Sequence, residues 1–360
     1  MIQSRRALQD VYRYPVPQAG RYGKLRLDKN ESPVGFPAHV IAEMIEGVSP
    51  EFLAAYPEPY TLYRKIAQWN GVEVENVLLA SGSEMAIRYL FEAFLTPGDQ
   101  RLILNPSFAM FEVYGKICGA RVVTQDYDRR FRISIPSLLD RIGKRTKIVA
   151  IANPNNPTGT VIRQPDLLRI VRKAAKGGAL VLVDEAYFFF YNETMLPHCR
   201  ELENLVVTRT FSKACGLAGL RLGYAVASPA VIKEMMKLQP IDHANCFALK
   251  LAEWLIDHEE VLWAHVKEVA EGKAFLVREL RKLGVKVVDG AANFVLFDAG
   301  KKKDEIVDRL QQQDILVAAH LRLLFHASHV RVAVGPVSQM SRFIEVLAGI
   351  LRKGPARGMR

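Results

Sequence analysis

Short apolar runs alternate with longer amphipathic stretches from about residue 25 onward, and this alternation constrains the fold more than any other feature. Strands that alternate with helices in this way predict a layered α/β sheet. Wholly apolar runs such as Leu180–Val183 are typical of central strands that are covered on both faces. The expected strands are Val77–Ala80, Arg101–Asn105, Arg121–Gln125, Lys147–Ala152, Leu180–Asp184, Leu205–Thr210 and Leu222–Ala227. The expected helices between them are Met85–Leu95, Phe108–Cys118 and Asp166–Lys176.

A different pattern follows Ser228-Pro229 and predicts a smaller α+β domain. At 360 residues the chain is long enough for two domains. We expect a large domain over residues 26–260, and a small domain made of residues 1–25, which include Pro15 and Pro17, and residues 261–360. The expected helices of the second pattern run to about Leu238, from about Ala248 to Leu283, over Lys303–Gln312 and over Ser338–Arg352. Its expected strands are Val285–Val288, Phe294–Phe297 and Val330–Val334.

Composition excludes several classes of protein. Apolar residues make up 49% of the chain, which excludes intrinsic disorder, and no run approaches the roughly 20 apolar residues of a membrane span. The net charge of +11 is not interleaved with any nucleic-acid-binding motif, so we expect no nucleic-acid or membrane partner. The opening residues lack the apolar core of a secretory signal, which predicts a cytoplasmic protein. The cysteines are far apart without metal-ligand spacing, so we expect reduced thiols and no metal: Cys118, Cys199, Cys215 and Cys246.

The segment from Thr208 to Tyr224 carries the clearest chemical signal. A predicted strand leads into Thr210, Ser212 and Lys213, and Arg221 follows eight residues after the lysine. Two hydroxyls and a guanidinium around one lysine suit a phosphate monoester on a molecule that the lysine attacks. A surface lysine in a turn is the alternative, and this segment alone does not separate the two.

Other strand ends add to this signal. Asp184 closes an apolar strand, where a carboxylate is costly unless it meets a cation such as a protonated ring nitrogen. Ser81–Glu84 lies between a strand and a helix, where free N–H groups form either an anion site or an ordinary helix cap. Asn153–Gly159 follows another strand, and its asparagines either face the same rim or belong to a plain turn.

Together these segments resemble the fold-type I, pyridoxal-phosphate-dependent aminotransferases, and most closely the histidinol-phosphate aminotransferase branch. The resemblance covers nearly the whole chain; it also includes Leu27–Pro33, Ala55–Pro57, Asn293–Phe297 and Val330–Gly335. It implies a large domain with a mostly parallel seven-stranded sheet and a smaller α+β domain. It further implies a homodimer with shared active sites that transfers an amino group between an amino acid or amino-phosphate and a 2-oxo acid, in amino-acid biosynthesis.

The resemblance also implies roles for residues around the cofactor. Lys213 would form the Schiff base and act as the general base, and Asp184 would keep the pyridinium nitrogen protonated. Tyr187 and Asn156 would bind the ring oxygen, and Phe108 would stack on the ring in place of the family's tyrosine. Tyr56 would reach the cofactor phosphate from the other subunit. The other phosphate contacts would come from the backbone N–H groups of Ser83 and Glu84 and from Thr210, Ser212 and Arg221.

On the substrate side the resemblance implies Arg331 as the grip on an anionic group, with Asn30 and Tyr22 nearby. Alternation within the strand could instead place Arg331 in solvent. Ala318 stands where the branch usually has a second arginine, although Arg322 is close to it in sequence. Ile241-Asp242-His243 replaces the usual Tyr-Asn pair, and Asp242 and His243 lie either by the substrate or in a surface turn. Both departures leave open whether histidinol phosphate is the substrate.

Two other functions stay open on the same scaffold. A pyridoxal-phosphate-dependent decarboxylase of phospho-amino acids would share the cofactor residues. A catalytically silent binding protein would share the fold alone, and the presence of Lys213, Asp184, Asn156 and Arg221 argues against it.

Overall fold

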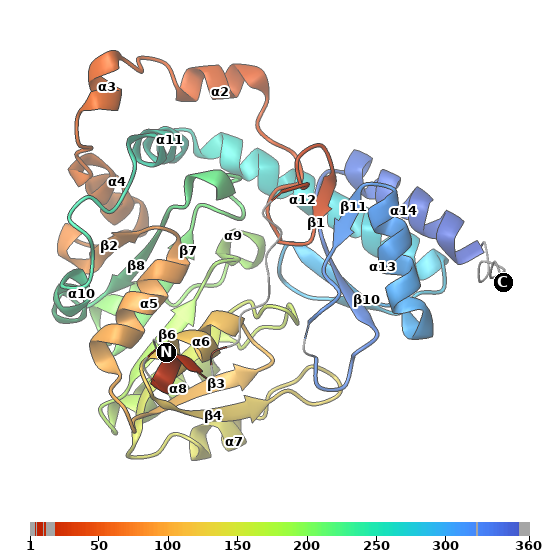
Figure 1. Ribbon diagram of the computed structural model, residues 1–360. Helices are drawn as coiled ribbons and strands as arrows, with labels where there is room; N and C mark the ends of the chain where they lie inside the picture. Colours follow the sequence, from red (N-terminus) through yellow and green to blue (C-terminus); the bar gives the residue numbers. More distant parts are fainter. Residues whose placement is uncertain (1–3, 5, 10, 12–18, 322, 353–360) are drawn as a thin grey trace.

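The chain folds into a large layered part and a smaller part, and helix α12 (Glu259–Lys282) runs from one to the other (Figure 1). The computed structural model describes residues 4, 6–9, 11, 19–321 and 323–352. Pro15, Pro17 and Arg322 lie outside the described residues. None of the helices in the described part of the chain is long and apolar enough to cross a membrane.

The large part is built on a seven-stranded sheet with the order β2-β8-β7-β6-β5-β3-β4. All neighbouring pairs are parallel except the two pairs that β8 makes with β2 and β7. The predicted α/β fold with a mostly parallel seven-stranded sheet is therefore confirmed. The strands are β2 (Val77–Ala80), β3 (Gln100–Asn105), β4 (Arg121–Asp126), β5 (Thr146–Ala152), β6 (Leu180–Asp184), β7 (Leu205–Thr210) and β8 (Gly223–Ala227).

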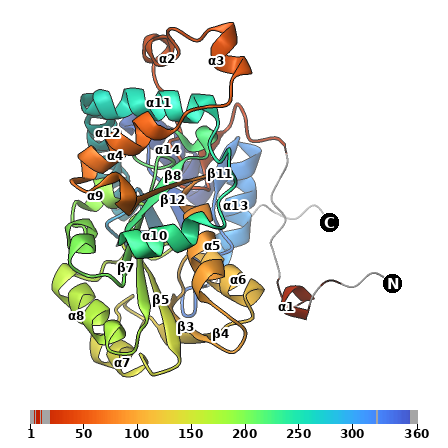
Figure 2. The ribbon, with the colours of Figure 1, turned by 90° about the vertical axis from the view of Figure 1, so that its left-hand side faces the viewer.

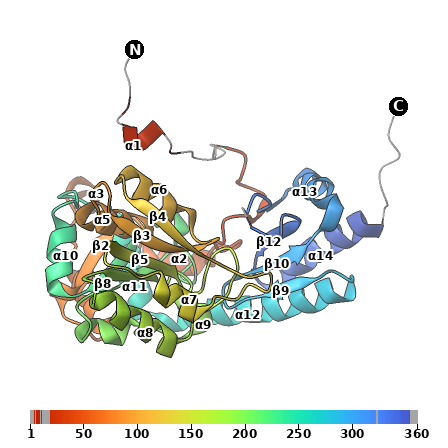
Figure 3. The same ribbon diagram turned by 90° about the horizontal axis from the view of Figure 1, so that it is seen from below.

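Helices cover both faces of this sheet, as Figure 3 shows from below. Successive strand residues point to opposite faces, so Val181 and Val183 join one apolar core and Leu182 joins the other. The helices of the first face are α4 (Tyr60–Asn70), α7 (Ile135–Asp140), α8 (Gln164–Ala175) and α11 (Cys246–Asp257). Those of the second face are α5 (Ser83–Phe94), α6 (Ala109–Ile117) and α10 (Pro229–Met236).

The smaller part has an antiparallel three-stranded sheet with the order β12-β10-β9. Its strands are β9 (Val287–Asp289), β10 (Phe294–Asp298) and β12 (His329–Ala333). Its core lies between this sheet and α12, α13 (Lys303–Gln312) and α14 (Val337–Arg352). The long helical region expected from about Ala248 to Leu283 consists of two helices, because α11 ends and α12 begins around His258, whose ψ of 55° is not helical.

A parallel pair of short strands, β1 (Leu25–Leu27) and β11 (Ile315–Val317), ties the N-terminal segment to the smaller part. Leu25 and Leu27 are both buried in the core of that part. The expected domain boundaries fall inside elements, after residue 25 within β1 and after residue 260 within α12. The division of the chain into two domains stays a prediction.

Six of the described α-helices were not expected from the sequence: α4, α7, α1 (Arg6–Gln9), α2 (Ala38–Met44), α3 (Pro50–Ala54) and α9 (Phe188–Tyr191). Helices α2 and α3 lie at the top of the molecule, at the edge of the large part, in two perpendicular views (Figures 1 and 2).

Three backbone segments approach closely between α12 and the start of α14. A Cβ atom added at Gly272 of α12 would lie 1.9 Å from the carbonyl oxygen of Gly335. A Cβ atom added at Gly335 would lie 2.3 Å from Cγ of Pro33. The absence of side chains at both glycines therefore lets α12 and the β12–α14 turn pack against the segment that follows β1.

Gly272→Ala should destabilise the protein, whereas Gly349→Ala should not. Both residues are helical glycines, but a Cβ atom at Gly349 in α14 would meet nothing within 4 Å. Overpacking against backbone lowers the free energy of unfolding by about 1–3 kcal/mol. Replacing glycine by alanine at an open helix position raises the free energy of unfolding by up to about 1 kcal/mol. Calorimetry of the two variants would measure this difference as a lower Tm for Gly272→Ala, and equal Tm values would contradict the close approach.

Candidate functional site

The predicted site residues gather at the carboxyl ends of the parallel strands β5, β6 and β7. Asp184 is the last residue of β6, and Lys213 follows three residues after the end of β7. Asn156 follows β5 in the turn that the two prolines shape. Carboxyl ends of parallel strands are the usual place for ligand sites in α/β proteins, because the loops that leave them meet at one edge.

Asp184 is a buried carboxylate that hydrogen-bonds to a hydroxyl. Its Oδ1 accepts a hydrogen bond of 2.9 Å from Oγ1 of Thr208, and the residue is 5% exposed. Burial raises the pKa of Asp184 to about 6, and the hydrogen bond from Thr208 opposes that shift. A cationic N–H beside this carboxylate would stabilise its charged form, as a protonated ring nitrogen does.

Lys213 presents a weakly basic amine to the same region. Its Nζ donates a hydrogen bond of 2.8 Å to the carbonyl oxygen of Lys29. Burial, with a further contribution from the charge of Arg331, lowers the pKa of Lys213 to about 8. An amine with a lowered pKa has a larger fraction of the neutral form near neutral pH, which is the form that attacks a carbonyl carbon.

A helix N-terminus and an arginine face each other beside these residues. Gly82 precedes α5 with a φ of 81°, and Ser83 and Glu84 form the first turn of that helix. A Cβ atom added at Gly82 would lie 2.7 Å from Nη2 of Arg221, so only a glycine lets the guanidinium approach this closely. The N–H groups of a first helical turn attract an anion, and a guanidinium beside them adds to that attraction.

Two hydroxyls complete this anion cup, which we define as the first turn of α5 with Arg221, Ser212 and Thr210. Arg221 Nη1 donates a hydrogen bond of 3.1 Å to Oγ of Ser212. The backbone N–H of Ser212 donates one of 3.1 Å to Oγ1 of Thr210. The carboxylate of Glu84 accepts a hydrogen bond of 2.7 Å from Tyr114, so Glu84 offers the cup its backbone N–H.

Arg331 of β12 reaches across from the smaller sheet. Its Nη1 donates a hydrogen bond of 2.6 Å to Oδ1 of Asn156, and its Nη2 donates a hydrogen bond of 2.7 Å to the carbonyl oxygen of Asp28. Nε of Arg331 is buried and has no hydrogen-bond partner among the described residues. The alternative that strand alternation directs Arg331 into solvent is therefore wrong.

Tyr187 lies three residues after β6 and is 4% exposed. Its hydroxyl accepts a hydrogen bond of 2.9 Å from Nδ2 of Asn30, and its ring packs edge-on against Phe294 of β10 at 5.5 Å. Asn30 is buried and points to Tyr187, although it was expected beside the substrate.

The segment Asp28–Asn30 links these residues through three successive backbone carbonyl groups. The carbonyl oxygen of Asp28 accepts a hydrogen bond from Arg331, and that of Lys29 accepts one from Lys213. The carbonyl oxygen of Asn30 accepts a hydrogen bond of 3.2 Å from Nδ2 of Asn293. The side chain of Asn30 adds the bond to Tyr187. A segment that comes directly after β1 of the smaller part therefore contacts a residue of β12 and residues that follow β6, follow β7 or precede β10.

Phe108 and Arg331 line a cavity of about 440 Å³ together with Asn156. Phe108 is the residue before α6, and its ring packs edge-on against Phe111 at 5.7 Å. His320 and Leu321, from the segment after β11, also line this cavity. The cavity is therefore bounded by residues of both sheets, and an aromatic ring and a guanidinium are both part of its lining.

Two predicted site residues are exposed, unlike the buried residues of this group. Tyr22 is 97% exposed and Tyr56, after α3, is 80% exposed. Of the segment that replaces the Tyr-Asn pair, His243 lies near Tyr63, with 3.5 Å between Nε2 and the hydroxyl, and its carbonyl oxygen accepts from Ser81. The structure therefore places His243 next to the turn before α5, while Asp242 is exposed.

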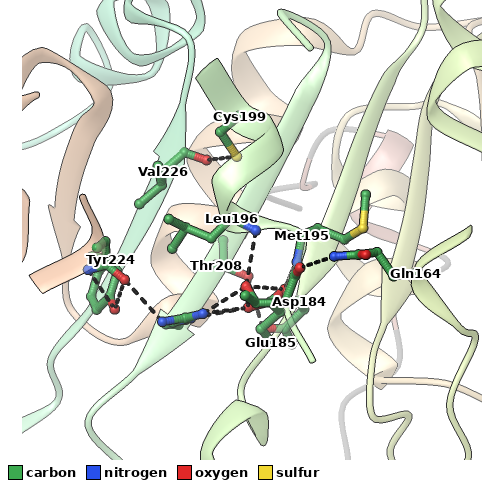
Figure 4. A network of polar contacts seen from close by, with 12 residues as sticks. Gln164, Asp184, Glu185, Met195, Leu196, Cys199, Thr208, Tyr224 and Val226 are labelled. Atoms are coloured by element: carbon green, nitrogen blue, oxygen red, sulfur yellow. Dashed lines mark hydrogen bonds and ion pairs between the residues drawn. The ribbon is translucent and has the colours of Figure 1, made fainter. Parts of the chain in front are cut away.

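A buried ion pair next to Asp184 was not predicted. Nη2 of Arg209 lies 3.0 Å from Oε2 of Glu185, and both residues are almost completely buried. Figure 4 shows Glu185 beside Asp184 and Thr208. The carboxylate of Glu185 also accepts from Thr194 and from the N–H of Met195, and Arg209 lies 3.6 Å above the ring of Phe188. The signal in the sequence was an opposite pair of charges in or beside two apolar strands, each of which needs a partner.

These groups suit a single kind of bound molecule. The anion cup would hold a phosphate group, the Lys213 amine would bond to a carbonyl carbon, and the buried carboxylate of Asp184 would hold a cationic ring N–H. Pyridoxal phosphate carries all three features, so the donor set of the site fits this cofactor.

Comparisons with known proteins identify a family and similar chains. The model of the family "Aminotransferase class I and II" matches residues 22–347. The chain is 32% identical over 332 residues to a histidinol-phosphate aminotransferase of Caldanaerobacter subterraneus subsp. tengcongensis, with 91% of this chain and 93% of the relative covered. It is 36% identical over 298 residues to one of Thermoanaerobacter sp., with 82% and 84% covered.

A solved structure shares the fold. The crystal structure of histidinol-phosphate aminotransferase from Sinorhizobium meliloti, in complex with pyridoxal-5'-phosphate, superposes with a TM-score of 0.86 at 22% identity, covering 98% of each chain. The family match spans both sheets and all the residues of the anion cup. The chain therefore belongs to the class I and II aminotransferases and is a pyridoxal-phosphate-dependent aminotransferase of fold type I.

Proposed function

We propose that this enzyme transfers the amino group of an amino acid or amino-phosphate to a 2-oxo acid, with Arg331 gripping an anionic group of the substrate. The observation that carries this proposal is the position of Arg331 on the wall of the 440 Å³ cavity, beside Asn156 and Phe108. A guanidinium binds carboxylate and phosphate groups through paired hydrogen bonds. Tyr22 and Asn30 belong to the proposal as neighbours of the substrate, although one is exposed and the other is buried against Tyr187.

The residue roles around the cofactor are part of the same proposal. Pyridoxal phosphate supplies an electron sink when it is bound. Asp184 would hold a proton on the ring nitrogen, and Asn156 and Tyr187 would hydrogen-bond to the ring oxygen. Phe108 would pack on the ring face. Lys213 would bond to the cofactor and, when displaced, move a proton to and from the substrate's Cα.

Lys213→Ala should abolish transamination while the fold is retained, since it removes both the bond to the cofactor and the proton carrier. Loss of one catalytic proton transfer alone costs about 10²–10⁴-fold in rate. Lys301→Ala, at an exposed lysine of the smaller part, is the matched control and should keep the wild-type rate.

The assay would follow amino transfer from a panel of amino donors to 2-oxoglutarate, with circular dichroism to check the fold. Activity of Lys213→Ala within tenfold of the wild type would contradict the role of Lys213. Release of carbon dioxide without a keto acid would favour the decarboxylase in place of amino transfer.

Histidinol phosphate is a candidate substrate because the similar proteins are named histidinol-phosphate aminotransferases. The residue at position 318 would affect how tightly this substrate binds. The backbones of Ala318 and Arg331 exchange hydrogen bonds of 3.0 and 2.8 Å. Directly paired residues of antiparallel strands point to the same face of a sheet, so a side chain at position 318 would lie beside Arg331.

Ala318→Arg should improve the use of histidinol phosphate, because a second guanidinium would then stand beside Arg331. A charge-assisted hydrogen bond to phosphate is worth about 1.5–3 kcal/mol, or about 10–150-fold in affinity. Ala318→Leu adds bulk without charge and should give no gain in kcat/KM. Efficient turnover by the unmodified enzyme would mean that other groups bind the phosphate.

A homodimer with shared sites is also part of the proposal. Exposed apolar side chains gather on and around α2 and α3, which is typical of a surface that another protein covers: Ile41, Ile45, Leu53, Tyr56 and Tyr60. Tyr56 would then reach the anion cup of the partner subunit. None of the four cysteines, which all lie in the described part of the chain, forms a disulfide, and this agrees with a reducing compartment such as the cytoplasm.

Mixed dimers should recover activity that the parent variants lack. If Lys213→Ala and Tyr56→Ala chains are unfolded and refolded together in equal amounts, half of the dimers are mixed, and each mixed dimer has one intact site. Random pairing predicts roughly a quarter of the wild-type activity. A mixture of Lys213→Ala and Asp184→Ala chains is the control. Both residues belong to the site of their own chain, so every site in a mixed dimer has one defect and no activity should be recovered. Full activity of a monomer in gel filtration would exclude the shared site.

A further inference from the structure

The hydrogen bond between Asn30 and Tyr187 joins two residues that are 157 positions apart in the chain. Nδ2 of Asn30 donates to the tyrosine hydroxyl over 2.9 Å, and both residues are almost completely buried. No other side-chain hydrogen bond to the Tyr187 hydroxyl occurs in the part of the chain that the structure describes. Asn30 is therefore the one side chain among the described residues that hydrogen-bonds to this hydroxyl.

Asn30 is held in place from several directions. Its φ of 55° lies in the left-handed region, which asparagine adopts more readily than most residues other than glycine. Its carbonyl oxygen accepts from Asn293, and the preceding carbonyl oxygen accepts from Lys213. With 1% of its surface exposed, the side chain is enclosed between Tyr187 and its neighbours and does not face the cavity beside Arg331.

The direction of this hydrogen bond has a chemical consequence for Tyr187. A hydroxyl that accepts a hydrogen bond from an amide still has its own proton to donate elsewhere. Donation into the hydroxyl oxygen also polarises the O–H bond and makes it a stronger donor. Burial raises the pKa of Tyr187, and the charge of Arg331 and the hydrogen bond from Asn30 both oppose that shift.

We propose that Asn30 is a positioning residue that acts through Tyr187: its amide donates to the hydroxyl and leaves the tyrosine proton free for the oxygen of the cofactor ring. This inference rests on the proposed function in one respect, the contact of Tyr187 with the ring oxygen. It gives Asn30 a role beyond that of a neighbour of the substrate, because the asparagine acts on the orientation of Tyr187. It also gives the left-handed turn after β1 a role in the chemistry.

The proposal can be tested by the absorption of the enzyme-bound cofactor as a function of pH, which reports the proton on the lysine nitrogen bonded to it. A hydrogen bond donated to the ring oxygen stabilises negative charge there and so lowers the pKa of that nitrogen. Asn30→Gly keeps the left-handed backbone but removes the amide, so the apparent pKa should rise by about 0.5–1 pH unit. Asn30→Ser, whose side chain is too short to reach Tyr187, should give the same rise and serves if the glycine variant is unstable.

A double variant separates action through Tyr187 from a local disturbance. Tyr187→Phe should raise the same apparent pKa, and adding Asn30→Gly to it should produce no further rise. Asn192→Gly is the matched control, because Asn192 is also a left-handed asparagine, with a φ of 66°, but is exposed outside the site. It should leave the titration unchanged.

Kinetics distinguish positioning from substrate contact. Positioning predicts that Asn30→Gly lowers kcat about tenfold while the KM of the amino donor changes by less than about threefold. A raised KM with an unchanged titration would overturn the proposal and return Asn30 to the substrate. Equal shifts in the wild-type and Tyr187→Phe backgrounds would overturn it as well.

Failure of the proposed function would look different. If Lys213→Ala bound the cofactor with the same pH-dependent absorption as the wild type, the assignment of Lys213 would fail. A titration that depends on Lys213 but does not respond to Asn30 would refute this inference alone.

Discussion

Three consecutive carbonyl groups, those of Asp28, Lys29 and Asn30, hold the site together. They accept hydrogen bonds from Arg331, Lys213 and Asn293, which come from three different places in the fold. Side chains on the smaller sheet are thereby positioned against the strand ends of the larger one. Glycines at 272 and 335 let this segment pack without a gap, because a Cβ atom at either one would collide with backbone or with Pro33.

Two adjacent carboxylates at the end of β6 have opposite environments. Glu185 is paired with Arg209 inside the protein and receives hydrogen bonds from Thr194 and Met195. Asp184 has the hydroxyl of Thr208, and burial raises its pKa to about 6. Glu185 is thus paired with a cation of the protein itself, whereas the side-chain partner of Asp184 is the neutral hydroxyl of Thr208.

Much of the fold, and the position of several candidate-site residues at one edge of the sheet, could be predicted because both depend on local pattern. Leu180–Asp184 and Leu205–Thr210 are predicted strands whose bounds match the structure, since their apolar runs end at polar residues. Lys213, Asp184 and Arg221 follow or end such strands, so sequence alone brought them to one edge of the sheet. The helices α2 and α3 were not predicted, and neither was the break at His258, because short helices and helix ends depend on contacts rather than on a periodic pattern.

The sequence by itself determined the alternation of the central strands with the helices between them, the family, the cofactor and the residues at the strand ends. Tertiary structure decided which distant groups meet: Asn30 with Tyr187, Arg331 with Asn156, and Arg209 with Glu185. The physical reason is that periodicity and turn chemistry act over a few neighbouring residues, whereas a buried polar group takes whichever partner the packing brings to it. Asn30 could therefore be recognised in a motif, but its partner became known only when the chain was folded.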